Sequence, residues 1–591
     1  MPSYSPPTKE YLFLLYEVFE IHKVNIPGFT QFTRDIVEPI LDEAGKLASE
    51  VVNPTNQEGD SIGCLLNNGS VETPKGFKKA FQMMREAGWP SLNCDTKYGG
   101  QGLPLTIATP VGEFFGAANV ALYIYNVLSH GVYSTILAHG TEKQKNAFLP
   151  KLANCEWTGT MNLTEPQCGT DLNLIRTKAF RKKDGSFEIT GQKIYISAGD
   201  HDLAENIIHL VLARIEKAPK GMSGISLFIV PKMLTNENSS TMKRNKVSVG
   251  KIESKMGIHG NATCVINYDG ARGFLLGQEN KGVRTMFTMM NEARLATGVQ
   301  GLSQAEIAYQ NSLRYAKDRV QGKSFSNRNN VDIDAEPIIV HPDVRRMLLK
   351  QKSFVEGARA FAIWSSLLID KGKLLNDQDA SGLVSLLVPI FKAFLTDKGF
   401  ESTVIAQQIF GGHGYVEDFG VSQFVRDSRI AMIYEGTNGI QALDLVGRKL
   451  LSDGGKHTTN FLAQVKKLGN QNTENAVFKE EFLVPLNESI LDLEAALQHF
   501  MKHGMSDPET VMTGATDFLH LFGHVVMGFM WTTIAEKIYF CYPKLKDNVF
   551  YQSKISTGKF YMKYSLPETK LRLTRLLADK GLIMNIDEKG F

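Results

Sequence analysis

Cysteine is scarce in this sequence. The 591 residues include six cysteines, and no two of them stand in a C-x-x-C pair. Zinc sites are usually built from such closely spaced pairs, and disulfide frameworks belong to short, cysteine-dense chains. We therefore expect neither a metal site nor a disulfide framework. The natural compartment for such thiols is a reducing cytoplasm.

An excess of charge of one sign is also lacking. Lys and Arg total 65 and Asp and Glu total 62, which gives a formal net charge of +3. Proteins dedicated to nucleic acid usually concentrate basic residues on one face. The balance therefore argues against a nucleic-acid-binding protein.

Long, uninterrupted apolar runs are missing as well. We find no run of about 18 apolar residues of the kind that spans a bilayer, so no integral membrane segment is expected. The N-terminal sequence MPSYSPPTKEYLFLLYEVFE lacks a basic first region, and Tyr and Glu interrupt its apolar stretch. It does not predict a signal peptide. Hydrophobic residues at 43% and charged residues at 21% are typical of a soluble globular protein with a sizeable core.

The period of the apolar residues changes along the chain. In residues 36–154 it is helical: Ile36, Ile40, Ala44 and Leu47 recur every three or four positions, and Thr141 is placed to cap a helix. Residues 155–272 contain short β-branched runs and an Asp-Gly hairpin signal at 184–185. Residues 273–451 and 461–591 are helical again, and the polar break at 451–460 predicts a linker.

This order predicts an α+β protein. We expect an N-terminal extension (1–35), an N-terminal helical domain (36–154), a central β-barrel-like domain (155–272), a helical bundle (273–451) and an additional C-terminal helical domain (461–591). The Met- and Phe-rich FGHVVMGFMW of the last region (522–531) is predicted to be core.

A lone acid, Glu435, follows the apolar run 430–434 and precedes Gly436 and a helix-starting Thr-Asn pair. An apolar pocket raises the pKa of a carboxyl group and strengthens it as a base. Gly436 has no side chain, so it would let a reacting group approach the backbone closely. The other interpretation is an ordinary first-turn acid, favoured by the helix dipole. On the pattern alone, the second interpretation is the commoner one.

Six blocks in order resemble the signatures of the acyl-CoA dehydrogenase family. They are MNLTEPQCGTDLNLIRTKA (161–179), GQKIYISAGD (191–200), KMGIHGNATC (255–264), DRVQG (318–322), QIFGGHGYVED (408–418) and IYEGTNGIQ (433–441). The likeness covers about residues 36–450. The extra N-terminal and C-terminal segments, with SAGDHDLAENIIHLVLAR (197–214), resemble the long branch of the family that includes 3-methylmercaptopropionyl-CoA dehydrogenases.

The resemblance implies FAD-dependent α,β-dehydrogenation of an acyl-CoA thioester to the trans-2-enoyl-CoA. Glu435 would remove the α proton while a hydride passes from the β carbon to flavin N5. The backbone N–H of Glu435 and a flavin hydroxyl would polarise the thioester carbonyl. Electrons would then pass to an electron-transfer flavoprotein. In this family context, the catalytic interpretation of Glu435 is the favoured one.

The resemblance also assigns binding residues. The isoalloxazine ring would be held by Met161, Leu163, Thr164, Gly169, Thr170, Tyr195, Ile196 and Ser197. The flavin pyrophosphate and adenosine of a neighbouring subunit would be reached by Arg319, Gln321, Gln408, Gly411 and Gly412. At a helix start, Thr437 and Gln441 would contact the flavin. The acyl-CoA would be contacted by Thr170, Arg294, Glu435 and Gly436, although Asn291 stands where the family commonly has Asp.

Ordinary structural roles stay open for several of these residues. Thr, Ser and Tyr commonly populate a β edge, an Arg near a helix end is usually solvated, and Thr437 fits an N-cap. His413, between glycines, is interpreted as structural rather than catalytic.

Three functions remain open: a dehydrogenase, an acyl-CoA oxidase that uses O2, and a non-catalytic relative that binds a macromolecule such as DNA. Glu435 and the balanced charge argue against the third. The acyl group is left open between short, medium and thioether chains. We expect a role in fatty acid β-oxidation, and a homodimer, because the C-terminal region would cover a face that other members use to form tetramers.

Overall fold

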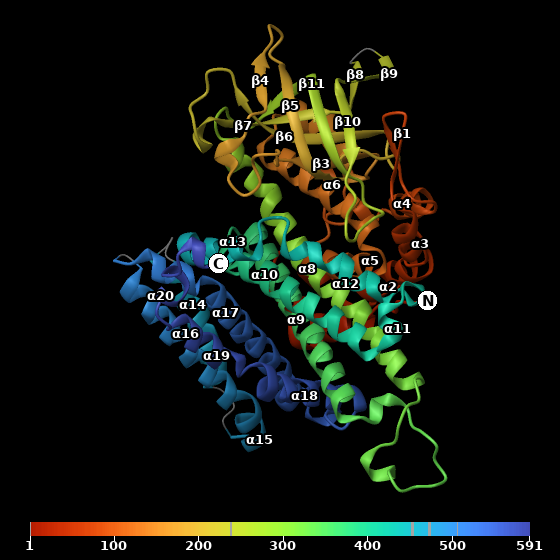
Figure 1. Cartoon of the computed structure of the whole chain (residues 1–591), viewed down its shortest axis with the longest axis vertical. Helices are drawn as coiled ribbons and strands as arrows, with labels where there is room; N and C mark the ends of the chain where they lie inside the picture. The colour runs from red at the N-terminus through yellow and green to blue at the C-terminus, as the bar shows by residue number, and fades with distance from the viewer. Residues whose placement is uncertain (1, 237–238, 451–453, 471–473, 505) are drawn as a thin grey trace. The chain divides into compact units, whose positions relative to one another are not determined.

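The described residues of the computed structural model fall into two units that interleave along the chain (Figure 1). The structure describes residues 2–236, 239–450, 454–470, 474–504 and 506–591. Unit 1 comprises Met1–Glu43, Leu105–Glu113 and Thr297–Phe591, and unit 2 comprises Ala44–Pro104 and Phe114–Ala296. Three helices pass from one unit into the other: α2 (Arg34–Leu47), α5 (Leu105–Ala118) and α8 (Gly282–Asp318).

Unit 2 is built on a seven-stranded sheet. Its strands are β3 (Trp157–Asn162), β4 (Lys178–Arg181), β5 (Phe187–Ser197), β6 (Asn206–Ile215), β7 (Ile225–Pro231), β10 (Val247–Ile252) and β11 (Thr263–Leu276). The order is β10-β11-β5-β4-β6-β3, and β7 pairs with both β11 and β6. The strands β11, β5, β4, β6 and β7 therefore close into a ring, which confirms the barrel-like prediction. Apolar side chains such as Phe187, Phe228 and Tyr268 fill its core.

Local signals in unit 2 behaved as the sequence predicted. The Asp-Gly pair connects β4 and β5 as an antiparallel hairpin, with Gly185 at φ 81° and the Lys182 N–H donating to the Ser186 carbonyl. Thr141 forms a reciprocal capping box with Gln144 at the start of α7 (Glu142–Ala153). The other elements of unit 2 are α3 (Pro54–Ile62), α4 (Phe77–Glu86), α6 (Val120–His139), and two small hairpins, β1 (Leu65–Asn67) with β2 (Ser70–Glu72) and β8 (Met233–Asn236) with β9 (Ser239–Arg244).

The apolar face predicted for α2 is wrong by one position. The helix is present, but Ile36 is 47% exposed, whereas Val37 and Leu41 are fully buried along with Ala44. The isoleucines and valines of this segment satisfy a 3.6-residue period in more than one phase. Packing decides which phase faces the core.

Unit 1 is a helical bundle that continues into the C-terminal region. Its longer helices are α9 (Pro342–Leu375), α10 (Gln378–Ile409), α12 (Val421–Arg429), α14 (Lys456–Gly469), α16 (Val484–His503), α17 (Pro508–Glu536), α18 (Val549–Phe560) and α19 (Glu568–Leu576). Shorter ones are α1 (Thr8–Phe13), α11 (Gly412–Tyr415), α13 (Asn438–Asp444), α15 (Ala476–Phe478) and α20 (Gly581–Met584). α17 packs against α9, α10, α13, α16 and α19, so the C-terminal helices share a core with the bundle.

The residues predicted to form that core do so. Phe522, Met527 and Trp531 of α17 are completely buried. The predicted linker at 451–460 is wrong in its second half, because α14 already begins at Lys456; residues 451–453 lie outside the described residues.

Among the described residues, two helical stretches are long and apolar enough to cross a membrane by length and composition, Gln378–Ile409 and Pro508–Cys541. Within the protein, 72% and 89% of their most apolar windows are buried. Core helices of this kind pass the same test of hydropathy, so the stretches carry little weight as membrane spans.

The first residues of the chain pack into unit 1 through buried ionic contacts. Arg359, only 2% exposed, donates to both oxygens of Glu113 at 3.0 and 2.6 Å and to Glu306 at 2.9 Å. Tyr11 donates to the same Glu113 carboxylate, and Lys554 of α18 is paired with Glu10. The N-terminal segment is thus part of the bundle core.

Candidate active site

Glu435 lies in a loop between a single 3-10 turn (Ile430–Met432) and α13. Its φ is 58° and that of Gly436 is 84°, so two consecutive residues are left-handed. A left-handed conformation is uncommon for a residue with a side chain and persists where surrounding contacts impose it. α13 begins at Asn438, capped by Thr437, whose Oγ1 accepts from the Ile440 N–H. The interpretation of Glu435 as a first-turn acid is therefore wrong.

The carboxylate of Glu435 is shielded on one side. The residue as a whole is half-buried, but its Oε2 is inaccessible to solvent. Burial, with the charge of Glu435 as a second cause, raises the pKa of the neighbouring Tyr434. The Tyr434 hydroxyl, which therefore stays neutral, donates to Gln300 Oε1 on α8. The acid thus combines a sheltered oxygen with an uncharged neighbour.

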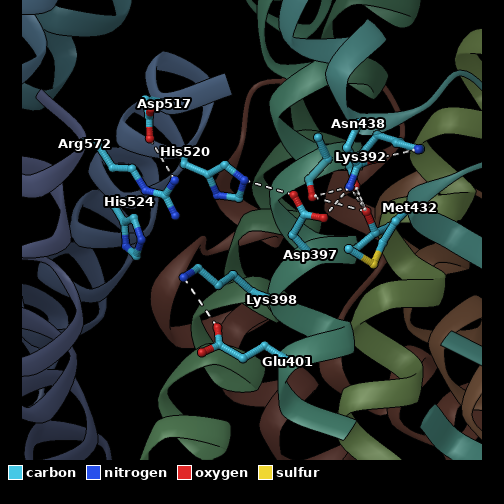
Figure 2. Close-up of polar contacts among 12 residues, drawn as sticks. Lys392, Asp397, Lys398, Glu401, Met432, Asn438, Asp517, His520, His524 and Arg572 are labelled. Atoms are coloured by element: carbon cyan, nitrogen blue, oxygen red, sulfur yellow. Dashed lines mark hydrogen bonds and ion pairs between the residues drawn. The ribbon is translucent and has the colours of Figure 1, made fainter. Parts of the chain in front are cut away.

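The backbone of this loop is held from two directions. Gln441 Nε2 donates to the carbonyls of Glu435 (3.1 Å) and Gly436 (3.2 Å). Lys392, on α10 and fully buried, donates to the Gly436 carbonyl and to Asn438 Oδ1, each at 2.8 Å (Figure 2). A Cβ at position 436 would stand 2.8 Å from Gln441 Nε2. The loop therefore requires glycine next to the acid.

Sequence reasoning missed Lys392. The signal was present as a single lysine inside the apolar stretch LVPIFKAFL of α10 (387–395). A lysine is almost never fully buried unless it is paired, so this position pointed to a partner in the core. The contact of Gln441 with the flavin stays a prediction, and in the structure the Gln441 amide Nε2 holds the loop through the Glu435 and Gly436 carbonyls.

The predicted pyrophosphate group comes together at one end of α8. Tyr315, on the last turns of that helix, stacks on Phe410 at 4.2 Å, which brings the 408–412 turn beside the chain segment that carries Arg319 and Gln321. That segment pairs with residues 336–338. All five predicted residues of this group are exposed on the chain, and a side chain at Gly411 or Gly412 would meet open space.

His413 has a structural role, as the sequence interpretation expected. Its Nδ1 is 2.9 Å from the Tyr315 hydroxyl and its ring stacks on Phe419 at 4.3 Å. These contacts fix the turn that follows Gly411 and Gly412.

In unit 2 the predicted isoalloxazine residues lie on adjacent chain segments. The Ile194 N–H donates to the Thr164 carbonyl (2.9 Å), and Thr160 Oγ1 donates to the Ser197 carbonyl (2.7 Å). Tyr195 is left-handed, with φ 58°, and 62% exposed. The Ile196 side chain belongs to the sheet core, so only its backbone is available to a ligand. The remaining members, Met161, Leu163, Gly169 and Thr170, are partly or fully accessible.

The turn after Thr164 is locked by a buried ion pair. Lys193 Nζ lies 2.8 Å from Glu165 Oε1, and both side chains are at most 3% exposed. Glu165 also accepts from the Arg176 and Thr177 N–H groups and from the Thr177 hydroxyl. Burial alone would raise the pKa of Glu165, but Lys193 and these donors lower it to about 2. The carboxylate is therefore charged at neutral pH, and it shapes the turn that carries Gly169 and Thr170.

Arg294, predicted to contact the CoA portion, lies in the unit 2 part of α8. It is 4% exposed, and its guanidinium is 5.9 Å from the centre of the Phe287 ring. The CoA contact stays a prediction.

The residues present fit a flavin in their chemistry. Gly169, Gly411 and Gly412 each leave room where a side chain would stand, and Tyr195 offers an accessible aromatic ring. Backbone N–H groups and short hydroxyls beside an aromatic ring suit a flat ring with polar edges, and Arg319 suits phosphate.

Family comparisons cover nearly the whole chain. Residues 37–156, 160–271 and 280–451 match the N-terminal, middle and C-terminal domains of acyl-CoA dehydrogenase, respectively. Residues 461–587 match the family described as acetyl-CoA dehydrogenase C-terminal like.

Relatives of full length are found as well. The chain is 37% identical to 3-methylmercaptopropionyl-CoA dehydrogenase of Ruegeria pomeroyi, over 97% of this chain and 98% of the relative. It is 32% identical to a broad-specificity linear acyl-CoA dehydrogenase of Mycobacterium tuberculosis over 100% of both. A butyryl-CoA dehydrogenase of Syntrophomonas wolfei is 34% identical over 90% of both.

Solved structures share the fold. An acyl-CoA dehydrogenase complexed with FAD from Bacillus anthracis superposes with a TM-score of 0.71 at 20% identity, over 94% of this chain and 90% of that one. A chain from the structure of the electron transferring flavoprotein of Acidaminococcus fermentans superposes with a TM-score of 0.59 at 27% identity, over 71% of this chain and 99% of that one.

Proposed function

The chain belongs to the acyl-CoA dehydrogenase family, an FAD-dependent family, and from this premise we propose that Glu435 is the base that removes the α proton of a straight-chain acyl-CoA. The observation that carries the proposal is the left-handed loop at Glu435 and Gly436, held by Lys392 and Gln441. Constrained backbone of this kind is concentrated at active sites.

Glu435 and Gly436 have different roles in the proposed reaction. Glu435 takes the proton on its carboxylate, and its backbone N–H polarises the thioester carbonyl, which stabilises the charge that develops on that oxygen. Gly436 lets the thioester approach the chain closely. Bound FAD supplies the acceptor for the hydride that leaves the β carbon. The oxygen Oε2 is sheltered from solvent, which suits the carboxylate to accepting a proton from a substrate rather than from water.

The relatives support the substrate class and the electron acceptor. One is named for 3-methylmercaptopropionyl-CoA, one for linear acyl-CoA and one for butyryl-CoA, all unbranched chains. A related chain is part of a structure described as an electron transferring flavoprotein, which supports electron-transfer flavoprotein as the acceptor. The exposure of Arg319 and Gln321 supports a homo-oligomer in which a neighbouring subunit brings its ligand to this face.

The test is anaerobic bleaching of the bound flavin by a series of acyl-CoA esters that includes butyryl-CoA and 3-methylmercaptopropionyl-CoA. We expect Glu435→Gln to retain FAD and to slow bleaching by about 10³-fold or more, because a positioned general base contributes rate enhancements of this order. Glu417→Gln is the matched control, since Glu417 forms a surface ion pair with Arg426.

Bleaching of Glu435→Gln at the wild-type rate would remove Glu435 from its role. A separate assay in air decides the acceptor: stoichiometric peroxide release during turnover would replace the dehydrogenase proposal with an acyl-CoA oxidase.

A further inference from the structure

We propose that Lys392 and His520 are positioning residues, which couple the C-terminal helices to the loop that carries Glu435. The inference deepens the proposed function and rests on it for the consequence in turnover. It concerns a chain of partly buried hydrogen bonds that runs from α17 through α10 to the loop (Figure 2).

The chain begins at His520 on α17, which is 6% exposed. Its Nε2 lies 2.9 Å from Asp397 Oδ2 on α10, and Figure 2 shows the ring pointing at that carboxylate. A carboxylate only accepts, so the imidazole donates through Nε2. His520 therefore fixes the position of one oxygen of Asp397.

The second oxygen of Asp397 continues the chain. Asn438 Nδ2, at the first position of α13, donates to Asp397 Oδ1 at 2.7 Å and to Thr396 Oγ1 at 3.0 Å. The side-chain amide oxygen of Asn438, Oδ1, in turn accepts a hydrogen bond from Lys392 Nζ at 2.8 Å. The amide of Asn438 is thus held on both its donor and its acceptor side.

Lys392 closes the chain on the loop backbone. Its ammonium also donates to the Gly436 carbonyl at 2.8 Å, one residue from Glu435. Because Lys392 is fully buried, its charge has to be met by acceptors of the protein, and here those acceptors are groups that define the loop. An ammonium donor in such surroundings is among the stronger hydrogen-bond donors of a protein.

The geometry assigns the C-terminal helices a part in setting the loop. Asp397 accepts a hydrogen bond from Asn438 of α13 on Oδ1 and one from His520 of α17 on Oδ2. The position of its carboxylate therefore depends on both helices. Removing the α17 donor leaves Asp397 free to follow Asn438 away from the Lys392 ammonium. The left-handed pair at 435 and 436 then loses one of the contacts that oppose its relaxation, while the Gln441 hydrogen bonds named above remain.

His520→Leu is the test, with His520→Gln as the rescuing variant, because the Gln side chain retains a donor that can reach Asp397. His524→Leu is the matched control: His524 lies one turn later on α17 and is also buried, but its ring contacts Tyr561 and Glu568. The holoenzyme is assayed for kcat, KM and FAD content. Amide hydrogen exchange of residues 433–444 is followed by mass spectrometry in the same samples.

We expect His520→Leu to lower kcat about tenfold with little change in KM, and Lys392→Met to lower it about a hundredfold, because misplacing a reacting group by about 1 Å costs rates of this order. Amides of the 433–444 peptide should exchange faster in both variants. His520→Gln should return both readouts close to wild type, and His524→Leu should leave both unchanged.

Equal exchange of the 433–444 peptide in wild type and His520→Leu would overturn the coupling. Equal effects of His520→Leu and His524→Leu would also overturn it, since general weakening of α17 would then be the cause. Hydrogen exchange does not require turnover. Loss of the proposed function, seen as a wild-type protein that no acyl-CoA bleaches, is therefore distinguishable from loss of the coupling.

Discussion

At the scale of single residues, the conformation of two positions separates a functional acid from an ordinary one. Glu435 has neither helical φ nor a place in the first turn of α13, so the helix dipole gives no reason for an acid there. The adjacent Gly436 is required by its φ of 84° and by the closeness of the Gln441 amide. The acid and the glycine form one structural feature.

Gly436→Ala should therefore damage turnover more than stability. The left-handed φ costs an alanine about 1–2 kcal/mol, and its Cβ would push the Gln441 amide off the Glu435 carbonyl. We expect kcat to fall about tenfold or more, by displacement of the carboxylate. Steady-state kinetics with a straight-chain acyl-CoA measures this.

Gly439→Ala provides the comparison for that experiment. Gly439 lies inside α13 with no crowding atom nearer than 4.0 Å, and alanine favours a helix more than glycine does. Wild-type kcat in Gly436→Ala would show that the loop does not need glycine.

At the scale of elements, buried lysines organise two of the segments that carry predicted site residues. Lys392 holds the loop after the 3-10 turn, and Lys193 on β5 holds the turn after β3 through Glu165. Each lysine sits on a regular element, and each has a partner in irregular backbone, Gly436 for Lys392 and Glu165 for Lys193. The rigid element thereby fixes the loop, which by itself has few ladder hydrogen bonds.

The pair of Glu165 and Lys193 predicts a pH dependence. The pKa of Glu165 is lowered from 4.5 to about 2 in the folded protein, so the carboxylate stabilises the fold fully above pH 4.5. That stabilisation is lost as the pH falls from 4.5 to 2, because the unfolded chain then binds the proton first. We expect the free energy of unfolding to fall over this window.

The double variant Glu165→Gln with Lys193→Met isolates this contribution, because it removes both charges together. Its urea-unfolding midpoint should change less than that of wild type between pH 4.5 and 2. Parallel pH profiles of the two proteins would assign the acid sensitivity to other carboxylates.

At the scale of the whole molecule, a buried ionic cluster ties residues distant in sequence into unit 1. Arg359 of α9 forms ion pairs with both Glu113 and Glu306. Glu113 also accepts a hydrogen bond from the Tyr11 hydroxyl near the N-terminus. Burial raises the pKa of Glu113, and the guanidinium opposes that rise. The cluster depends on one arginine.

Arg359→Met should accordingly lower the free energy of unfolding by about 3–5 kcal/mol, because it leaves two buried carboxylates without their cation. Arg346→Met is the control, since Arg346 pairs with Asp343 at the surface and such pairs contribute about 0–1 kcal/mol. Denaturant unfolding followed by circular dichroism compares the two. Equal loss in both variants would deny the cluster a special role.

By itself the sequence determined the order of helical and β regions, the hairpin at Asp184 and Gly185, the helix cap at Thr141 and the family. Each of these follows from local signals: apolar period, turn chemistry, capping residues and ordered motifs. It also singled out Glu435, although the local pattern alone favoured an ordinary first-turn acid at this position.

The tertiary structure alone decided which face of α2 is buried, that Glu435 stands outside its helix in a left-handed loop, and that Lys392, Asp397 and His520 reach that loop from two other helices. Local sequence leaves the contacts of Lys392 and His520 open, because their partners Gly436 and Asp397 are more than 40 residues away in the chain. The role of a buried charge depends on the group with which it pairs, and only the folded chain brings the two together.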